Sequence, residues 1–102
     1  MDMKKMMKQA QKMQLELAMA QEEAQHMTAE ATAGGGMVEV VAKGDMSIVS
    51  VEISQSAIDF DDREMMQDMV CAATNEALRA VSAQVSLRLN AATGGMNIPG
   101  LM

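Results

Sequence analysis

The sequence predicts an α+β fold in which a helix, three strands and a second helix follow one another along a single domain of 102 residues. Two long segments lack Gly and Pro and repeat apolar residues every three or four positions, which is the spacing of a helix. Short alternating segments rich in β-branched residues lie between them and are separated by glycines, which is typical of strands. We therefore expect a small antiparallel sheet flanked by two long helices.

The first helix is predicted over residues 1–27 as an arm with two different sides. Its apolar positions alternate in steps of three and four and include Met6, Met13 and Leu17. Because this heptad-like spacing persists to residue 27, we favour a helix–helix contact that includes a second chain over packing within the core. At about 100° per residue, the lysines fall within about 100° of arc, centred roughly 140° from the apolar stripe. These lysines are Lys4, Lys5, Lys8 and Lys12.

A three-stranded sheet region is predicted over residues 28–54. The strands are expected at residues 28–33, 37–42 and 46–53. Turn-forming residues at 43–45 join the last two strands as an antiparallel hairpin. In the last strand, Val49, Val51 and Ile53 share one face, and Ile48, Ser50 and Glu52 lie on the other. We expect Val49 and Val51 to contribute to a dimer interface.

The second helix is predicted over residues 61–92. Asp61 followed by Glu64 has the spacing of an N-cap with a reciprocal capping acid, and Thr93 followed by two glycines ends the helix. Cys71 lies between apolar neighbours and is predicted to be a small buried side chain. Residues 93–102 show no periodicity and are predicted to form a flexible tail.

Charge is distributed unevenly along the chain. The net charge of −6 argues against a generic nucleic-acid binder. The first twelve residues nevertheless carry four lysines and one Asp, whereas the rest carries four cations and thirteen acids. The basic tip is either a solvated helix face that keeps the protein soluble or a polyanion-binding site, and the residues alone leave both interpretations open.

No catalytic constellation, metal-ligand set or cofactor motif is visible in the sequence. His26 stands alone and is expected at the surface or at a helix end, and the glycines at 34–36 lack the phosphate-loop pattern. We therefore expect no enzymatic activity, cofactor, metal or small-molecule substrate. The single cysteine fits a reducing compartment, and no apolar run approaches the ~18 residues that span a membrane. These features predict a cytoplasmic protein without a membrane partner.

Along nearly its whole length the sequence resembles the YbaB/EbfC family of bacterial nucleoid-associated proteins. Each matching fragment is weak alone, but together they are specific in their order and spacing. The fragments lie at residues 7–14, 35–40, 51–54, 61–70, 72–77 and 94–101. The resemblance implies an α-β-β-β-α protomer in an intertwined, tweezer-like homodimer whose long helices project.

The resemblance also implies binding of double-stranded DNA with low sequence specificity and a location at the nucleoid. Carried onto this chain, the DNA-contacting residues are the four lysines of the first helix, with Arg88 as a weaker candidate. Position 39 is Glu where many members carry Lys, which shifts the expected contact to the N-terminal lysines.

A function of another class stays open at this point. The Met-rich helix faces are suited to docking a partner protein, because flexible Met surfaces adapt to many shapes. The chain would then be a dimeric interaction adaptor that does not bind DNA, and its lysines would serve solubility.

Overall fold

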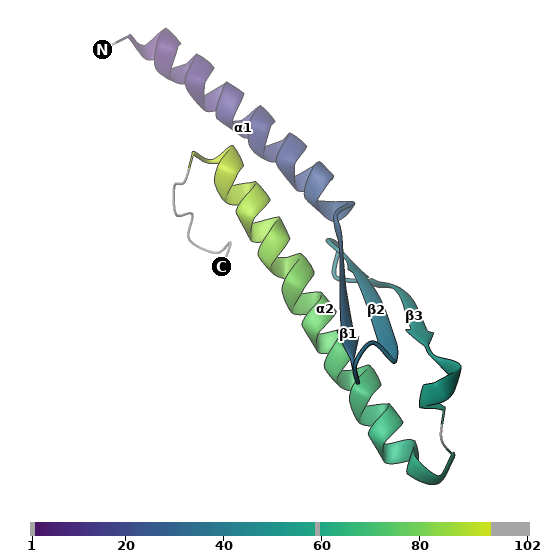
Figure 1. Ribbon diagram of the computed structural model, residues 1–102. Helices are drawn as coiled ribbons and strands as arrows, with labels where there is room; N and C mark the ends of the chain where they lie inside the picture. The colour runs from purple at the N-terminus through teal and green to yellow at the C-terminus, as the bar shows by residue number, and fades with distance from the viewer. Residues whose placement is uncertain (1, 59, 95–102) are drawn as a thin grey trace.

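The computed structural model describes residues 2–58 and 60–94. Its elements are α1 (Met3–Gln25), β1 (Thr28–Ala33), β2 (Val38–Lys43), β3 (Ile48–Ile53) and α2 (Arg63–Ala92), with short 3-10 turns at Gln55–Ala57 and Phe60–Asp62. The strands form one antiparallel sheet in the order β1-β2-β3. Figure 1 shows the small sheet between the two long helices, so the predicted α+β fold is confirmed.

Helix α1 projects from the rest of the chain as an arm. It begins where the Asp2 side chain accepts a hydrogen bond from the Lys4 backbone N–H at 3.1 Å, and it ends at His26. Its 23 residues span about 34 Å, and its N-terminal half extends past the end of α2 (Figure 1). The radius of gyration of 19.3 Å therefore exceeds the about 13 Å of a compact 100-residue domain.

The hydrophobic core lies between α2 and one face of the sheet. Val38, Val40 and Ala42 of β2 are buried, as their alternation predicted. They pack against a row on α2 at four-residue spacing, formed by Ala73, Ala77 and Val81. Most of these side chains are small, so the helix approaches the sheet closely. Helix α1 joins α2 in the same way, through the buried residues Ala20 and Ala24.

Strand β3 lies at an edge that α2 leaves uncovered, because α2 packs over β1 and β2 (Figure 1). Val51 pairs with Val40 and shares its inward face, yet Val51 is 44% exposed and Val49 is 56% exposed. We expected Ile48 to lie on the opposite face of β3 from Val51, and this expectation was wrong. An irregularity at Val41/Ala42 shifts the register and places Ile48 across from Ala42.

The C-terminal end of α1 packs against the turn between β2 and β3. The Gly44 N–H donates to the Met27 carbonyl at 2.8 Å, immediately after the helix ends. A Cβ atom at Gly44 would overlap the carbonyl oxygen of Ala24, so only glycine permits this approach. Ser47 donates hydrogen bonds to the Asp45 carboxylate from its hydroxyl and its backbone, which lowers the pKa of Asp45. The predicted hairpin turn is confirmed.

Two expectations for α2 need correction. The N-cap is Asp62, whose carboxylate accepts from the Met65 N–H at 3.2 Å, because a 3-10 turn occupies Phe60–Asp62 and delays the helix by two residues. Cys71 is exposed rather than buried, since it points away from the side of α2 that meets the sheet. Of the predicted tail, 93–94 are described and 95–102 lie outside the described residues.

Candidate nucleic-acid interface

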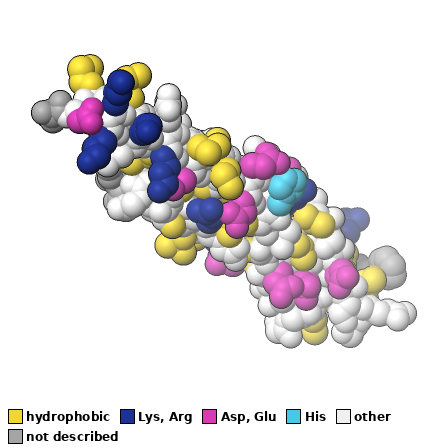
Figure 2. Space-filling model, turned by 90° about the horizontal axis from the view of Figure 1, so that it is seen from above, with side chains coloured by type: hydrophobic (Ala, Val, Ile, Leu, Met, Phe, Trp, Pro, Cys, Tyr) yellow, Lys and Arg dark blue, Asp and Glu magenta, His cyan; other side chains and the backbone are white. Residues whose placement is uncertain are grey.

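The four predicted lysines lie together on the first turns of α1. Lys4, Lys8 and Lys12 follow one another at steps of four residues, with Lys5 beside them, and all four are exposed. They extend over about 12 Å of helix. Figure 2 shows Lys and Arg side chains gathered at this end, with most acidic side chains and the single histidine farther along. The structure therefore brings these four predicted site residues onto one surface.

The charges of these lysines are not compensated within the described chain. Among residues 2–58 and 60–94, no carboxylate forms an ion pair with Lys4, Lys5, Lys8 or Lys12. The acids of α1 begin only at Glu16, beyond the lysines. Exposed ammonium groups that lack internal partners attract anions, and phosphate is the anion that a Lys point charge binds without selecting a base.

Arg88 has a different place from the one the sequence suggested. Its Nε donates to the Glu23 Oε2 at 2.8 Å, and its side chain is only 33% exposed. Glu23 lies about 16 Å along α1 from Lys12, so Arg88 is not part of the lysine group. This ion pair links α2 to the C-terminal part of α1. Direct contact between Arg88 and DNA stays a prediction.

The outer face of the sheet is acidic. Glu39 on β2 pairs directly with Glu52 on β3, and Glu30 on β1 lies diagonally beside it. Repulsion from Glu30, partial desolvation and repulsion from Glu52, in that order, raise the pKa of Glu39. This face repels a polyanion, whereas the tip of α1 carries exposed positive charge that attracts one.

Replacing Glu39 by Gln is expected to stabilise the fold at neutral pH. The pKa of Glu39 is raised in the folded state above 4.5, the ordinary pKa of a glutamate. The wild-type chain therefore loses stability as the pH rises from 4.5 through the folded pKa. Thermal unfolding should show a higher midpoint for Glu39→Gln at about pH 7 and a smaller difference at about pH 4. Glu16→Gln, at an exposed helix position, is the control, and an equal gain in both variants at pH 7 would contradict the expectation.

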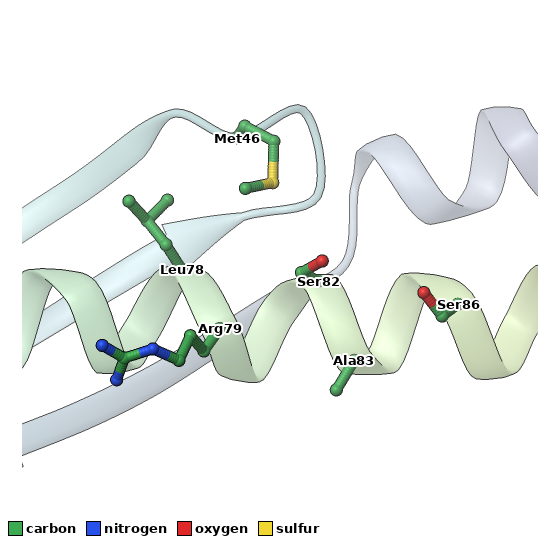
Figure 3. A pocket seen from close by; sticks show the side chains of 6 residues that line it. All are labelled: Met46, Leu78, Arg79, Ser82, Ala83 and Ser86. Carbon is green, nitrogen blue, oxygen red and sulfur yellow. The ribbon is translucent and has the colours of Figure 1, made fainter. Parts of the chain in front are cut away.

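An uncovered apolar surface lies away from the lysines. We call it the β3 face and define it by Met46, Val49, Val51 and Ile53, all exposed. Figure 3 shows Met46, from the turn before β3, and Leu78 of α2 pointing toward one another over an open hollow of about 430 Å³. Sequence reasoning placed Val49, Val51 and Ile53 on one face through their alternation, named only the two valines as dimer residues, and missed Met46.

The other predicted dimer residues lie on a separate surface. Met6 is 51% exposed, Met13 is exposed to a smaller degree, and Leu17 is half-buried. All three belong to the apolar side of α1, whereas the β3 face belongs to the sheet. The structure therefore divides the predicted dimer set into two surfaces, and their part in an interface stays a prediction.

Three further features bear on the class of site. His26 lies at the end of α1, where its Nε2 is 3.2 Å from the Glu22 carboxylate, as expected of a helix-end histidine. Within the part of the chain that the structure describes, no three His, Cys, Asp or Glu residues gather as metal ligands would. No described helix is both long and apolar enough to cross a membrane.

Comparison with known proteins places the chain in a family. The profile described as "YbaB/EbfC DNA-binding family" matches residues 1–96. A nucleoid-associated protein of Pelotomaculum thermopropionicum is 51% identical over 98% of this chain and 95% of its own. A second nucleoid-associated protein, from Thermoanaerobacter pseudethanolicus, is 50% identical over 94% of this chain and 86% of its own length. The crystal structure of an uncharacterized Helicobacter pylori protein, HP0035, superposes with a TM-score of 0.63 at 27% identity, covering 82% of this chain and 88% of that one. This chain belongs to the YbaB/EbfC DNA-binding family.

Proposed function

We propose that this protein binds double-stranded DNA at the nucleoid in the cytoplasm, as a homodimer that grips the duplex with the tips of two α1 helices. The observation that carries the proposal is a set of four exposed lysines on a projecting helix of an otherwise acidic chain, none of which forms an ion pair with another described residue. Membership of a DNA-binding family, rather than a family of enzymes, supports it.

The proposed mechanism is electrostatic. Lysines that approach phosphates displace condensed counterions, and this release drives binding without reading the bases. An α-helix fits the about 12 Å width of the major groove, but the cations at the tip of α1 are all lysines, which contact phosphates as point charges, and the tip presents no Arg or Asn side chain. We therefore expect low sequence specificity.

The proposed dimer forms through the β3 face. Apolar side chains at an uncovered sheet edge favour association with another surface of the same kind. A two-fold copy brings a second arm and doubles the lysines from four to eight, so both strands of one duplex can be contacted. Self-association also supplies the apolar burial that a chain of this length otherwise lacks.

Charge reversal at the tip separates DNA binding from the adaptor function. Lys5→Glu combined with Lys8→Glu is expected to abolish retention of duplex DNA in a mobility-shift assay, because two of four phosphate contacts per arm become repulsive. The control combines Lys43→Glu with Arg63→Glu, which makes the same change in charge away from the lysine tip and should retain binding. If the tip variant and the control bind DNA equally, the lysine tip is not the grip. If the wild-type chain retains no DNA and captures a protein instead, the adaptor function is correct.

A further inference from the structure

Helix α1 joins the rest of the chain over a short stretch near its C-terminal end. Within the described helix only Ala20 and Ala24 are buried, and residues 3–16 are all exposed. Alanine side chains offer few atoms for dispersion contacts, and the crossing angles of packed helices scatter by about 15–20°. The two alanines therefore bring α1 and α2 close together but define the direction of the arm only weakly.

An ion pair bridges α1 and α2 beside these alanines. The Arg88 Nε donates to the Glu23 Oε2 at 2.8 Å, and the two side chains are 33% and 60% exposed. Arg88 also lines two open hollows at this junction, of about 220 and about 510 Å³, so side-chain packing does not fill the space around it. The ion pair between Glu22 and His26, by contrast, lies within α1. The contact between Arg88 and Glu23 is therefore placed to resist a change in the angle between the two helices.

The length of α1 turns a small rotation at this junction into a large displacement of the lysines. The hydrogen bond from the Gly44 N–H to the Met27 carbonyl holds the C-terminal end of α1, and the N-terminal half extends past the end of α2 (Figure 1). Lys4 lies about 28 Å along the helix from Glu23. A rotation of about 10° at the junction therefore moves Lys4 by about 5 Å, which is more than the about 4 Å over which an ion pair holds.

We propose that the ion pair between Arg88 and Glu23 fixes the direction of the arm and thereby positions the four lysines for the duplex. Arg88 is then a positioning residue, which acts on DNA through the lysines and does not itself contact a phosphate. The second part of this inference rests on the proposed DNA function, whereas the first part concerns only the angle between α1 and α2. Each part therefore has its own measurement.

The direction of the arm can be measured within one chain. Spin labels are placed by Gln9→Cys on α1 and Asn90→Cys near the end of α2, both exposed positions, in a chain that also carries Cys71→Ser. Dilution with an excess of unlabelled Cys71→Ser chain confines the signal to two labels in the same chain. In double electron–electron resonance, Glu23→Gln and Arg88→Gln should each widen the distance distribution by about 2 Å or more, since a rotation of about 10° displaces position 9 by about 4 Å.

A matched control and a rescue accompany these variants. Glu22→Gln removes the same charge from the neighbouring position of α1 but breaks a contact within that helix, so the distribution should stay as narrow as in the wild-type chain. The charge swap Glu23→Arg with Arg88→Glu keeps the net charge and the opposite signs of the pair. It should restore the narrow distribution that either single variant loses.

DNA binding separates a positioning role from a direct contact. If Arg88 contacted a phosphate, Glu23→Gln would release it from its carboxylate and strengthen binding, whereas Arg88→Gln would weaken binding. Positioning instead predicts that both variants weaken binding by about threefold to fivefold, which is within the range that an exposed ion pair supplies. The charge swap should bind as tightly as the wild-type chain. Fluorescence anisotropy of a labelled duplex, with chains that carry no spin label, gives these affinities.

The outcomes are distinct. Wider distributions and weaker DNA binding in both single variants, each restored by the charge swap, support the proposal. Distributions as narrow as that of the wild-type chain in both single variants overturn it. Tighter DNA binding by Glu23→Gln also overturns it, because Arg88 then contacts the phosphates directly. A wild-type chain that binds no DNA contradicts the proposed function, whereas wider distributions in the single variants still support the first part of the inference.

Discussion

A chain carrying both Val49→Asp and Val51→Asp is expected to be monomeric at micromolar concentration. The two valines are 56% and 44% exposed on the uncovered β3 edge, so the substitutions leave the core of one chain intact. At a two-fold interface, four carboxylates replace four apolar side chains and lose their hydration. This should weaken self-association by at least about 4 kcal/mol, or about a thousandfold in Kd. Multi-angle light scattering measures the mass directly.

Loss of the dimer should also weaken DNA binding, because a monomer offers four lysines instead of eight. Ser50→Asp is the control: it adds a charge to the same strand on the face opposite Val51, across from Val41. This control should remain dimeric. A Val49→Asp, Val51→Asp chain that keeps the mass of a dimer would show that the β3 face is not the interface.

Gly44→Ala is expected to be the most destabilising substitution at the base of the arm. The added methyl would overlap the Ala24 carbonyl and press on Val85, and separating α1 from the turn to relieve this overlap would stretch the hydrogen bond from the Gly44 N–H to the Met27 carbonyl. Overpacking of this kind costs about 2–3 kcal/mol. Urea unfolding at equal protein concentration gives the change in the free energy of unfolding.

Gly35→Ala is the matched control for this prediction. Gly35 has a φ of +69°, but nothing lies within 4 Å of an added Cβ, so its substitution costs only backbone strain of about 1–2 kcal/mol. Gly44→Ala should therefore destabilise the fold more than Gly35→Ala. The reverse order would mean that α1 is not held by this close approach.

Local patterns were sufficient to predict the order of elements and the buried face of β2. Helical periodicity without Gly or Pro identified α1 and α2, and the alternation of Val38, Val40 and Ala42 identified the inward face. These signals succeed because a helix or a half-buried strand repeats its environment at a fixed interval. The hairpin turn at 43–45 succeeded for the same local reason, through its own turn-forming residues.

The expectations that failed depended on a competing local choice or on residue type. Asp61 and Asp62 are both capable caps, and the preceding 3-10 turn selects Asp62. Cys71 was predicted to be buried because it is a small apolar side chain between apolar neighbours, yet it lies two residues from Ala73, about 160° around the helix. Periodicity was the better guide at this position than composition.

The candidate site was predictable only in part. The lysine cluster follows from spacing within one helix, so Lys4, Lys5, Lys8 and Lys12 were found directly. The contact between Arg88 and Glu23 joins residues 65 positions apart, and no local pattern encodes which carboxylate an arginine meets. The exposure of β3 likewise depends on where α2 crosses the sheet, and this is set by tertiary packing rather than by a local pattern.

The salt dependence of DNA binding tests the electrostatic grip most directly. Fluorescence anisotropy of a labelled ~30-base-pair duplex, titrated with the wild-type chain from about 20 to about 200 mM salt, gives the slope of log affinity against log salt. Eight engaged lysines predict a slope near about −7, and half of them predict about −3 to −4. The quadruple variant with Ala at positions 4, 5, 8 and 12 should lose this binding. An affinity that barely changes with salt, or no binding at about 20 mM, would contradict the account.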